Sequence, residues 1–295
     1  MASAPQLSLD PRFLRKLESL ALVSRRLASG SQRGERTSRQ SGAGIAFASH
    51  RAYAPGDDFR FVDWKAFARS DRLYVKQFEE ERDLLLHLVL DCSSSMAYGD
   101  GAKFDYEKRL AAALGYIALA NLERVSVQPF ASEPLPRLAP LRGKNRALVL
   151  LRYLAELRAE GGTALAKAVK AVLAEPQRGL SFVLSDGFDG AGLLAGVDLL
   201  RFAGLEPLVL LISDPRERAL DLSGEVTLVD SETGEASTLR ADARLLTRYR
   251  AAYDQRLHTL RSALAQRRVP LVELSIEVPL ERAVLDLLRR GGVVR

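Results

Sequence analysis

Residues 84–95 read LLLHLVLDCSSS, an apolar run that ends abruptly in an acidic residue, a cysteine and three serines. An almost unbroken apolar run of this length is typical of a strand buried on both faces, as in a parallel sheet covered by helices. His87 lies inside the run, so we expect it to be a core residue. Ligands of α/β proteins bind where parallel strands end, which is where Asp91 to Ser95 lie. The stretch therefore predicts an α/β fold and the place of a site.

Strand and helix patterns alternate along the rest of the chain. Further strands are expected at 125–130, 180–184, 207–212 and 271–274, with a short edge strand at 135–138. Helices are expected at 105–122, 145–158, 163–174, 191–202, 242–267 and 280–290. Repeated strand–helix units predict a mostly parallel central sheet with helices on both faces. Residues 214–240 interrupt this rhythm, and the Gly-containing turn at 232–235 predicts a β-hairpin insertion.

The first quarter of the chain has a different pattern. A helical spacing covers 10–28, a Gly/Ser/Arg-rich loop follows, and residues 73–78 alternate like a half-exposed strand. Residues 1–80 hold 14 basic and 9 acidic residues, against 43 and 37 in the whole chain, whose net charge is +6. We therefore expect an N-terminal basic extension, 1–80, before an α/β domain, 81–295.

The basic surplus does not by itself indicate a nucleic-acid-binding protein. The stretch from Arg25 to Arg39 is either a solvated arm or a surface for an acidic partner, anionic lipid or nucleic acid. No aromatic residues interleave with its arginines, so nucleic-acid binding is the least favoured of these.

The chain has one cysteine, Cys92, which excludes an internal disulfide and a multi-cysteine zinc site. Its N-terminus lacks the apolar core of a signal peptide. The longest apolar runs are far shorter than the roughly 18–20 residues of a membrane span. These features lead us to expect a soluble, cytoplasmic protein.

Polar residues that carry oxygen donors follow the predicted strands. Asp91, Ser93 and Ser95 end the first strand, Asp186 follows the strand at 180–184, and Thr163 opens a helix. Carboxylates and hydroxyls suit Mg²⁺, with Mn²⁺ or Ca²⁺ as substitutes, rather than zinc. Each residue also has a local alternative, because Ser and Thr cap helices and Asp-Gly forms turns.

This set, in this order, resembles the metal-ion-dependent adhesion site (MIDAS) of von Willebrand factor A domains, which follows the pattern Asp-x-Ser-x-Ser, then Thr, then Asp. The resemblance implies that Asp91, Ser93, Ser95, Thr163 and Asp186 bind the metal directly or through water. It also implies that an open position on the metal accepts a carboxylate from a protein partner.

A second resemblance lies upstream. GAGIAF at 42–47, YAPGDDFRFVDW at 53–64 and VKQFE at 75–79 resemble the signature of the DUF58 family (domain of unknown function 58), which joins this motif to a von Willebrand A-like domain. The resemblance covers roughly residues 30–290. Many members carry transmembrane helices upstream, and this chain looks like a free-standing soluble member. Members are commonly encoded beside a MoxR-type AAA+ ATPase, which implies an adaptor role in assembling or activating other proteins.

The charged and aromatic residues of the YAPGDDFRFVDW region have two interpretations. They form either a network that braces a turn, with the tryptophan anchored against the sheet, or a docking surface, since Trp and Arg are frequent at interface hot spots. The residues in question are Asp57, Asp58, Arg60, Asp63, Trp64 and Arg69.

An enzyme with a nucleophile needs a base beside it. None of the three histidines, His50, His87 and His258, is expected near the metal ligands, and no phosphate-binding Gly-Lys-Ser/Thr loop is present. We therefore favour a Mg²⁺-dependent protein-interaction module over an enzyme. The alternative is a metal-dependent hydrolase, phosphatase-like, in which Asp91 and Asp186 hold an ion that activates water.

Overall fold

A computed structural model describes residues 10–18, 45–80, 84–133, 135–172 and 179–290. The chain divides into two compact units. The main unit combines residues 1–32 with 84–295, and the small unit comprises residues 33–83. Each is described by itself.

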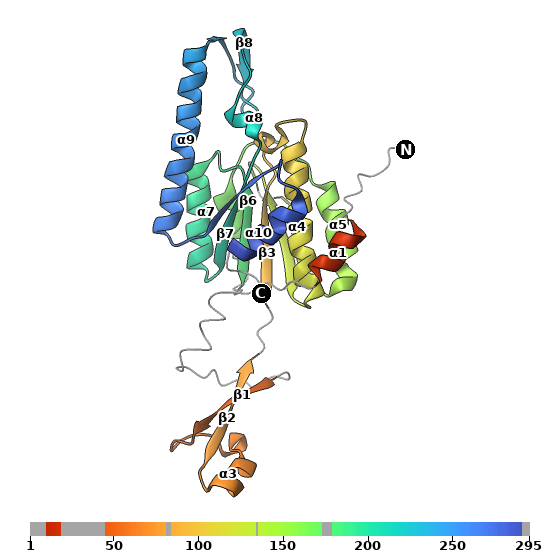
Figure 1. Cartoon of the computed structure of the whole chain (residues 1–295), viewed down its shortest axis with the longest axis vertical. Helices are drawn as coiled ribbons and strands as arrows, with labels where there is room; N and C mark the ends of the chain where they lie inside the picture. Colours follow the sequence, from red (N-terminus) through yellow and green to blue (C-terminus); the bar gives the residue numbers. More distant parts are fainter. Residues whose placement is uncertain (1–9, 19–44, 81–83, 134, 173–178, 291–295) are drawn as a thin grey trace. The chain divides into compact units, whose positions relative to one another are not determined.

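The main unit is built on a six-stranded sheet whose strand order is β10-β7-β6-β3-β4-β5 (Figure 1). All neighbours pair in parallel except β4 and β5, so the predicted mostly parallel α/β fold is confirmed. The strands are β3 (Leu85–Asp91), β4 (Arg124–Phe130), β5 (Leu138–Arg142), β6 (Leu180–Ser185), β7 (Glu206–Ser213) and β10 (Leu271–Ser275).

Helices cover both faces of this sheet (Figure 1). One face packs against α1 (Pro11–Leu17), α4 (Ala102–Ala120), α5 (Ala147–Glu156) and α10 (Leu280–Arg290). The other packs against α6 (Leu165–Val172), α7 (Gly190–Phe202) and α9 (Ala243–Gln266). In β3, Leu86, Leu88 and Leu90 pack on the face covered by α4, and Val89 packs on the face covered by α7. This alternation is typical of a strand that is buried on both faces.

The strand order places a topological switch point between β3 and β6. From β3 the chain crosses to β4 through α4 on one face, whereas from β6 it crosses to β7 through α7 on the other. Loops that leave two neighbouring parallel strands toward opposite faces open a crevice at the carboxyl ends of those strands. The ends concerned are Asp91 and Ser185.

Two segments differ from the sequence-based expectation. The edge strand β5 begins at Leu138, where the prediction ended, and it runs antiparallel to β4. The first helix ends at Leu17, and residues 19–28 of its prediction lie outside the described residues. This helix buries Phe13 and Leu17 in the main core, and the Tyr116 hydroxyl donates to Glu18 at 2.7 Å. It thus packs with the α/β domain, not with the extension to which the sequence analysis assigned it.

His87 is a buried core residue, as expected. It is 5% exposed, and its Nδ1 lies 2.8 Å from the Ser126 hydroxyl on the neighbouring strand. Burial and the charges of Arg124 and Arg137 lower the pKa of His87 to about 4, so its ring is neutral at pH 7.

Beyond the sheet, the described part of the main unit includes the short helical segments η2 (Ser94–Ala97), η3 (Lys144–Arg146) and α8 (Pro215–Arg218), and a β-hairpin, β8 (Gly224–Val229) with β9 (Ala236–Ala241). The small unit pairs β1 (Ile45–Ala52) antiparallel with β2 (Tyr74–Glu80) around η1 (Phe59–Phe61) and α3 (Trp64–Ser70). In the described part of the chain, no helix combines the length and the apolar character needed to cross a membrane.

One glycine at the start of β6 permits the close approach of β3. A Cβ built on Gly179 would lie 2.0 Å from the carbonyl oxygen of Leu85, and backbone atoms cannot rotate away as a side chain does. We expect Gly179→Ala to lower the free energy of unfolding by about 1–3 kcal/mol, measured by urea denaturation. The matched control is Gly190→Ala at the start of α7, where no atom lies within 4 Å of the added methyl group. Equal stability of the two variants would contradict this packing.

Candidate metal centre

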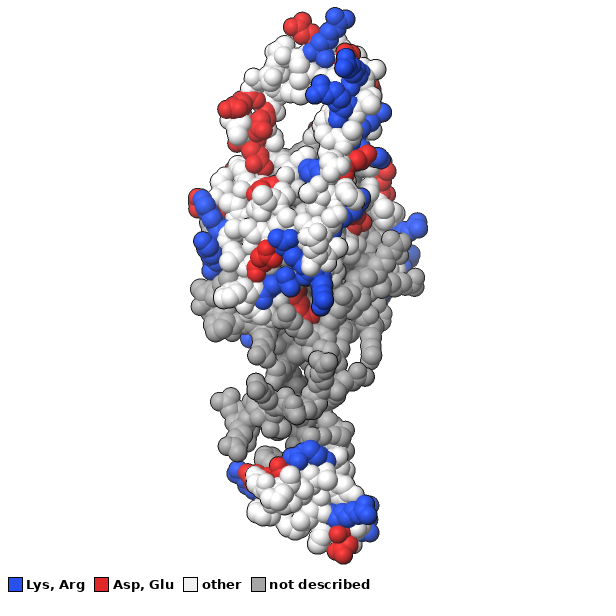
Figure 2. Space-filling view, turned by 90° about the vertical axis from the view of Figure 1, so that its left-hand side faces the viewer, with Lys and Arg blue, Asp and Glu red and all other residues white. Residues whose placement is uncertain are grey.

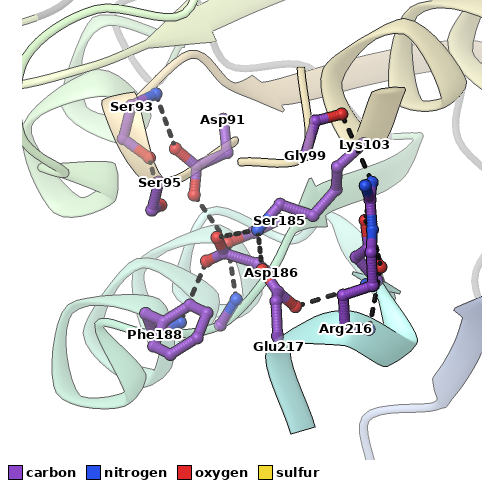
Figure 3. Close-up of polar contacts among 12 residues, drawn as sticks. Asp91, Ser93, Ser95, Gly99, Lys103, Ser185, Asp186, Phe188, Arg216 and Glu217 are labelled. Carbon is purple, nitrogen blue, oxygen red and sulfur yellow. Dashed lines mark hydrogen bonds and ion pairs between the residues drawn. The ribbon is translucent and has the colours of Figure 1, made fainter. Parts of the chain in front are cut away.

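Asp91 ends β3 at the switch point and is 1% exposed. Its Oδ1 accepts a hydrogen bond from the Ser93 amide (3.1 Å), and its Oδ2 accepts one from the Ser185 hydroxyl (2.6 Å). Its own amide donates to Oε1 of Glu107 on α4 at 3.0 Å. No cationic side chain pairs with this carboxylate among the described residues. Figure 3 shows it facing the loop that carries Ser93 and Ser95.

The hydroxyl oxygens of Ser93 and Ser95 lie 3.0 Å apart. Two ligands at right angles around Mg²⁺, each about 2.1 Å from the ion, are separated by about 3.0 Å, so the pair has the spacing of adjacent octahedral ligands. Ser93 precedes η2 but makes no capping bond with its side chain. The helix-cap alternative therefore does not account for this serine.

Asp186 follows β6 and uses both carboxylate oxygens within the protein. Oδ1 accepts from the Phe188 amide at 3.1 Å, which is the turn role considered as an alternative, and Oδ2 accepts from the ammonium of Lys103 at 2.8 Å. Lys103 is fully buried and also donates to Glu217 of α8 (Figure 3). Asp186 is thus held by an internal cation, and it lies beside Ser185, which binds Asp91.

Thr163 lies in the 161–163 loop, which the Ser94 amide ties to the serine loop by donating to the Gly161 carbonyl at 2.8 Å. Its hydroxyl donates to Oε1 of Glu232, in the turn of the β8–β9 hairpin, at 3.0 Å. The structure therefore brings Asp91, Ser93 and Ser95 together through direct hydrogen bonds. It joins Thr163 to them through the loop backbone rather than through its side chain.

Negative charge is in excess in this interior. The carboxyl groups of Asp91, Glu107, Asp186 and Glu217 are all buried, and Lys103 is the cation that bonds to two of them. Burial and the charge of Asp186 raise the pKa of Asp91 to about 7, and burial with the Asp91 charge raises that of Glu107. Burial opposes the charged form of Lys103, but Asp186 and Glu217 outweigh it and raise its pKa. A bound divalent cation would offset the remaining negative charge.

Three of the five predicted metal ligands are hydroxyl groups and two are carboxylates. Among the described residues, no three His, Cys, Asp or Glu side chains gather closely enough to hold an ion. The residues therefore fit a divalent cation bound by Asp91 and the two serines, with water as the remaining ligands.

Sequence reasoning missed Lys103, Glu107, Ser185 and Glu217. Lys103 and Glu107 are four residues apart on α4 and so share one face of the helix. That spacing is common in exposed ion pairs, so it gave no sign that both side chains point into the sheet end. Ser185 directly precedes the predicted Asp186, and its position at the strand end was the available signal.

The predicted docking residues lie in the small unit, where the acidic ones support local turns. Asp57 accepts from Arg51 and the Ala54 amide, both at 2.8 Å. Asp63 caps α3 and bonds to His50 at 2.8 Å. Similarly, Asp58 caps η1 and pairs with Arg60, while Arg69 donates to the Lys65 carbonyl at 3.1 Å. The bracing interpretation thus accounts for the aspartates.

Trp64 behaves differently from the aspartates. It is 58% exposed and makes an edge contact with Phe67 within the small unit, so the anchoring of this tryptophan against the sheet stays a prediction.

The hydrogen bonds of two histidines are made away from the five predicted metal ligands. His50 bonds to Asp63 in the small unit, His87 is buried between β3 and β4, and His258 is exposed on α9. Cys92 is buried, and burial raises the pKa of its thiol.

The comparisons with known proteins give the family. The model of the family described as "Protein of unknown function DUF58" matches residues 49–260. The chain belongs to the DUF58 family. A relative of this DUF58 chain, an uncharacterized protein of Mycobacterium tuberculosis, is 28% identical over 242 residues, which is 80% of this chain and 76% of that protein.

Two solved structures are similar to this DUF58 chain. BatB from Bacteroides thetaiotaomicron has a TM-score of 0.44 and 16% identity, over 71% of this chain and 98% of BatB. Proximal thread matrix protein 1 from the mussel byssus, "with zinc occupied MIDAS motif", has a TM-score of 0.36 and 15% identity, over 44% of this chain and 36% of that one.

Proposed function

We propose that the protein is a metal-dependent protein-interaction module in which Asp91, Ser93 and Ser95 hold Mg²⁺, assisted by Thr163 and Asp186. The observation that carries the proposal is the buried Asp91 carboxylate, without a cationic partner among the described residues and beside two hydroxyls 3.0 Å apart. A metal bound there would supply an electrophilic position for a carboxylate of the partner. Mn²⁺ or Ca²⁺ would serve as substitutes.

The protein's own residues would prepare this site in three ways. Ser185 and the Ser93 amide fix the Asp91 carboxylate in one orientation. Lys103 neutralises part of the charge of Asp186, which leaves Asp91 as the strongest anionic ligand in the centre. Because both oxygens of Asp186 are engaged, we propose that it acts through water rather than by direct ligation.

An interaction module agrees with this site better than the hydrolase alternative does. A hydrolase needs a group that accepts a proton from the attacking water. His87 bonds to Ser126 within the sheet, and the carboxylates of Asp91 and Asp186 already accept hydrogen bonds from protein groups on both of their oxygens. We extend the proposal to an adaptor role beside a MoxR-type AAA+ ATPase, on the basis of the family resemblance.

We propose that the small unit adds a docking surface around Trp64. A tryptophan that is 58% exposed offers the apolar area typical of interface hot spots, and Arg69 is exposed on the same helix. Asp57, Asp58, Arg60 and Asp63 would keep that surface in shape through the bonds described above.

The test is divalent-metal binding by isothermal titration calorimetry, followed by affinity capture of partners with and without Mg²⁺. We expect Asp91→Ala to weaken Mg²⁺ and Mn²⁺ binding about 100-fold or more and to abolish Mg²⁺-dependent capture of the AAA+ ATPase. Asp221→Asn, which removes an exposed aspartate of the main unit, is the matched control and should behave as wild type. Unchanged metal binding by Asp91→Ala would refute the proposed site, and Mg²⁺-stimulated phosphoester turnover would favour the hydrolase.

A further inference from the structure

The segment α8–β8–β9 contacts the candidate metal centre at two separate points. At its root, Glu217 of α8 bonds to Lys103, which also holds Asp186. At its tip, Glu232 accepts the hydrogen bond from Thr163 at 3.0 Å. The hairpin insertion, for which the fold alone gives no role, is therefore attached to the centre at both ends.

The carboxylate of Glu232 lies against the 161–163 loop. A Cβ built on Gly162 would be 3.3 Å from Oε2 of Glu232, so both carboxylate oxygens lie close to this loop. The same loop is bonded to Ser94, between the two candidate serine ligands. Glu232 thus contacts the loop that is bonded directly to the serine loop.

The hairpin turn holds Glu232 in a defined position. Oδ1 of Asp230 accepts the amides of Glu232 and Thr233, both at 2.8 Å, and the Gly234 amide donates to the Asp230 carbonyl at 2.9 Å. Gly234 has a φ of +76°, which a residue with a Cβ rarely adopts. A turn fixed in this way presents the Glu232 side chain toward Thr163.

The β8–β9 hairpin buries little of its surface against the rest of the main unit. Its strands are exposed along most of their length, including Leu228 at 43% and Val229 at 63%. An isolated two-stranded hairpin is at best marginally stable, so we expect β8 and β9 to open at a lower free energy than the strands of the sheet. At the end of the main unit that carries the hairpin and α9, acidic and basic side chains gather largely in separate groups (Figure 2).

We infer that Glu232 is a carboxylate ligand that the chain itself supplies to the metal centre. It takes the position that the proposed function reserves for the acidic group of a partner, and the inference rests on that proposed function. A hard cation held by Asp91, Ser93 and Ser95 prefers a further charged oxygen to a water molecule. A partner must then displace Glu232, so only a protein with a well-placed acidic group opens the site.

The experiment uses Mn²⁺ alone as the probe, on the full chain. Its affinity is measured by calorimetry, its bound water by proton relaxation, and the hairpin by amide hydrogen exchange. We expect Glu232→Gln to weaken Mn²⁺ binding about tenfold or more and to add a fast-exchanging water to the bound ion. In wild type, Mn²⁺ should slow exchange of the hairpin amides, and in Glu232→Gln it should not. Glu235→Gln removes the same charge from the same turn without a contact to Thr163, and should match wild type.

The outcomes separate the two proposals. If wild type binds Mn²⁺ and Asp91→Ala does not, but Glu232→Gln matches wild type in affinity, bound water and hairpin exchange, the Glu232 inference is wrong and the metal centre stands. If wild type itself binds no Mn²⁺, the proposed function fails and the inference fails with it. Weaker binding by Glu235→Gln to the same extent would show a general charge effect of the hairpin, which also overturns the inference.

Discussion

Lys103→Met is expected to lower the free energy of unfolding of the metal-free protein by about 3–5 kcal/mol. The Lys103 ammonium is fully buried and bonds to Asp186 and Glu217, which are themselves buried. Methionine fills a similar volume but leaves two carboxylates in the interior without their cation. Chemical denaturation at pH 7 in the presence of a chelator measures the loss.

Two further variants separate charge from packing. Lys167→Met breaks an exposed ion pair with Glu133 and should change stability by no more than about 1 kcal/mol. Combining Lys103→Met with Glu217→Gln removes one of the two orphaned charges and should recover part of the lost stability. A loss below about 1 kcal/mol for Lys103→Met alone would contradict the buried ion pairs.

The same variant reports on the metal centre. In wild type, Oδ2 of Asp186 is bound to the Lys103 ammonium at 2.8 Å and is not free for a metal. Without that ammonium, Asp186 becomes available, so Mg²⁺ should stabilise Lys103→Met more than it stabilises wild type. We therefore expect Lys103 to limit the affinity of the proposed centre for metal.

The strands of the sheet were predictable because burial on both faces leaves a direct mark on the sequence. The stretch before Asp91 and the one before Ser185 are almost wholly apolar, and a strand that packs helices on both faces has no polar side. Their polar ends followed from the same reasoning, since parallel strands bring their carboxyl ends to one edge. Asp91, Ser93 and Ser95 therefore came together as the sequence indicated.

What escaped prediction depends on contacts between residues far apart in the chain. Lys103 and Glu217 are separated by 114 positions, and Thr163 and Glu232 by 69. Each of these side chains is polar and lies in a segment that reads as an ordinary helix or turn. Only the path of the chain decides whether such a residue faces solvent or another charge, and local pattern does not encode that path.

Trp64 shows how local capping sets the position of an aromatic side chain within the small unit. A large aromatic residue in a motif is usually expected to be buried, because its apolar area favours removal from water. In the small unit it is 58% exposed at the start of α3, where Asp63 caps the helix through the amides of Lys65 and Ala66. The local capping determines where the helix begins, and this leaves the first residue of the helix facing outward.

Asp91→Asn is expected to stabilise the metal-free protein at neutral pH while removing its response to metal. The folded-state pKa of Asp91 is raised from 3.8 to about 7 by burial and by Asp186. Between these values the unfolded chain loses the proton and the folded chain keeps it, so stability falls as pH rises from about 4 to 7. A shift of this size corresponds to about 4 kcal/mol, and asparagine has no proton to lose.

The measurement is the difference in unfolding free energy between Asp91→Asn and wild type across this pH range, with a chelator and then with saturating Mg²⁺. Subtraction cancels titrations that both proteins share, including that of His87, which acts in the opposite direction over an overlapping range. With a chelator, the unfolding free energy of the variant should increase relative to that of wild type as the pH rises to 7. Above pH 7 the difference should remain constant. With Mg²⁺, wild type should recover the stability that it loses at neutral pH, because the ion binds the ionised Asp91 carboxylate that the folded state otherwise disfavours. A pH-independent difference would mean that Asp91 is not the buried acid of this centre, and a Mg²⁺ response retained by the variant would place the metal elsewhere.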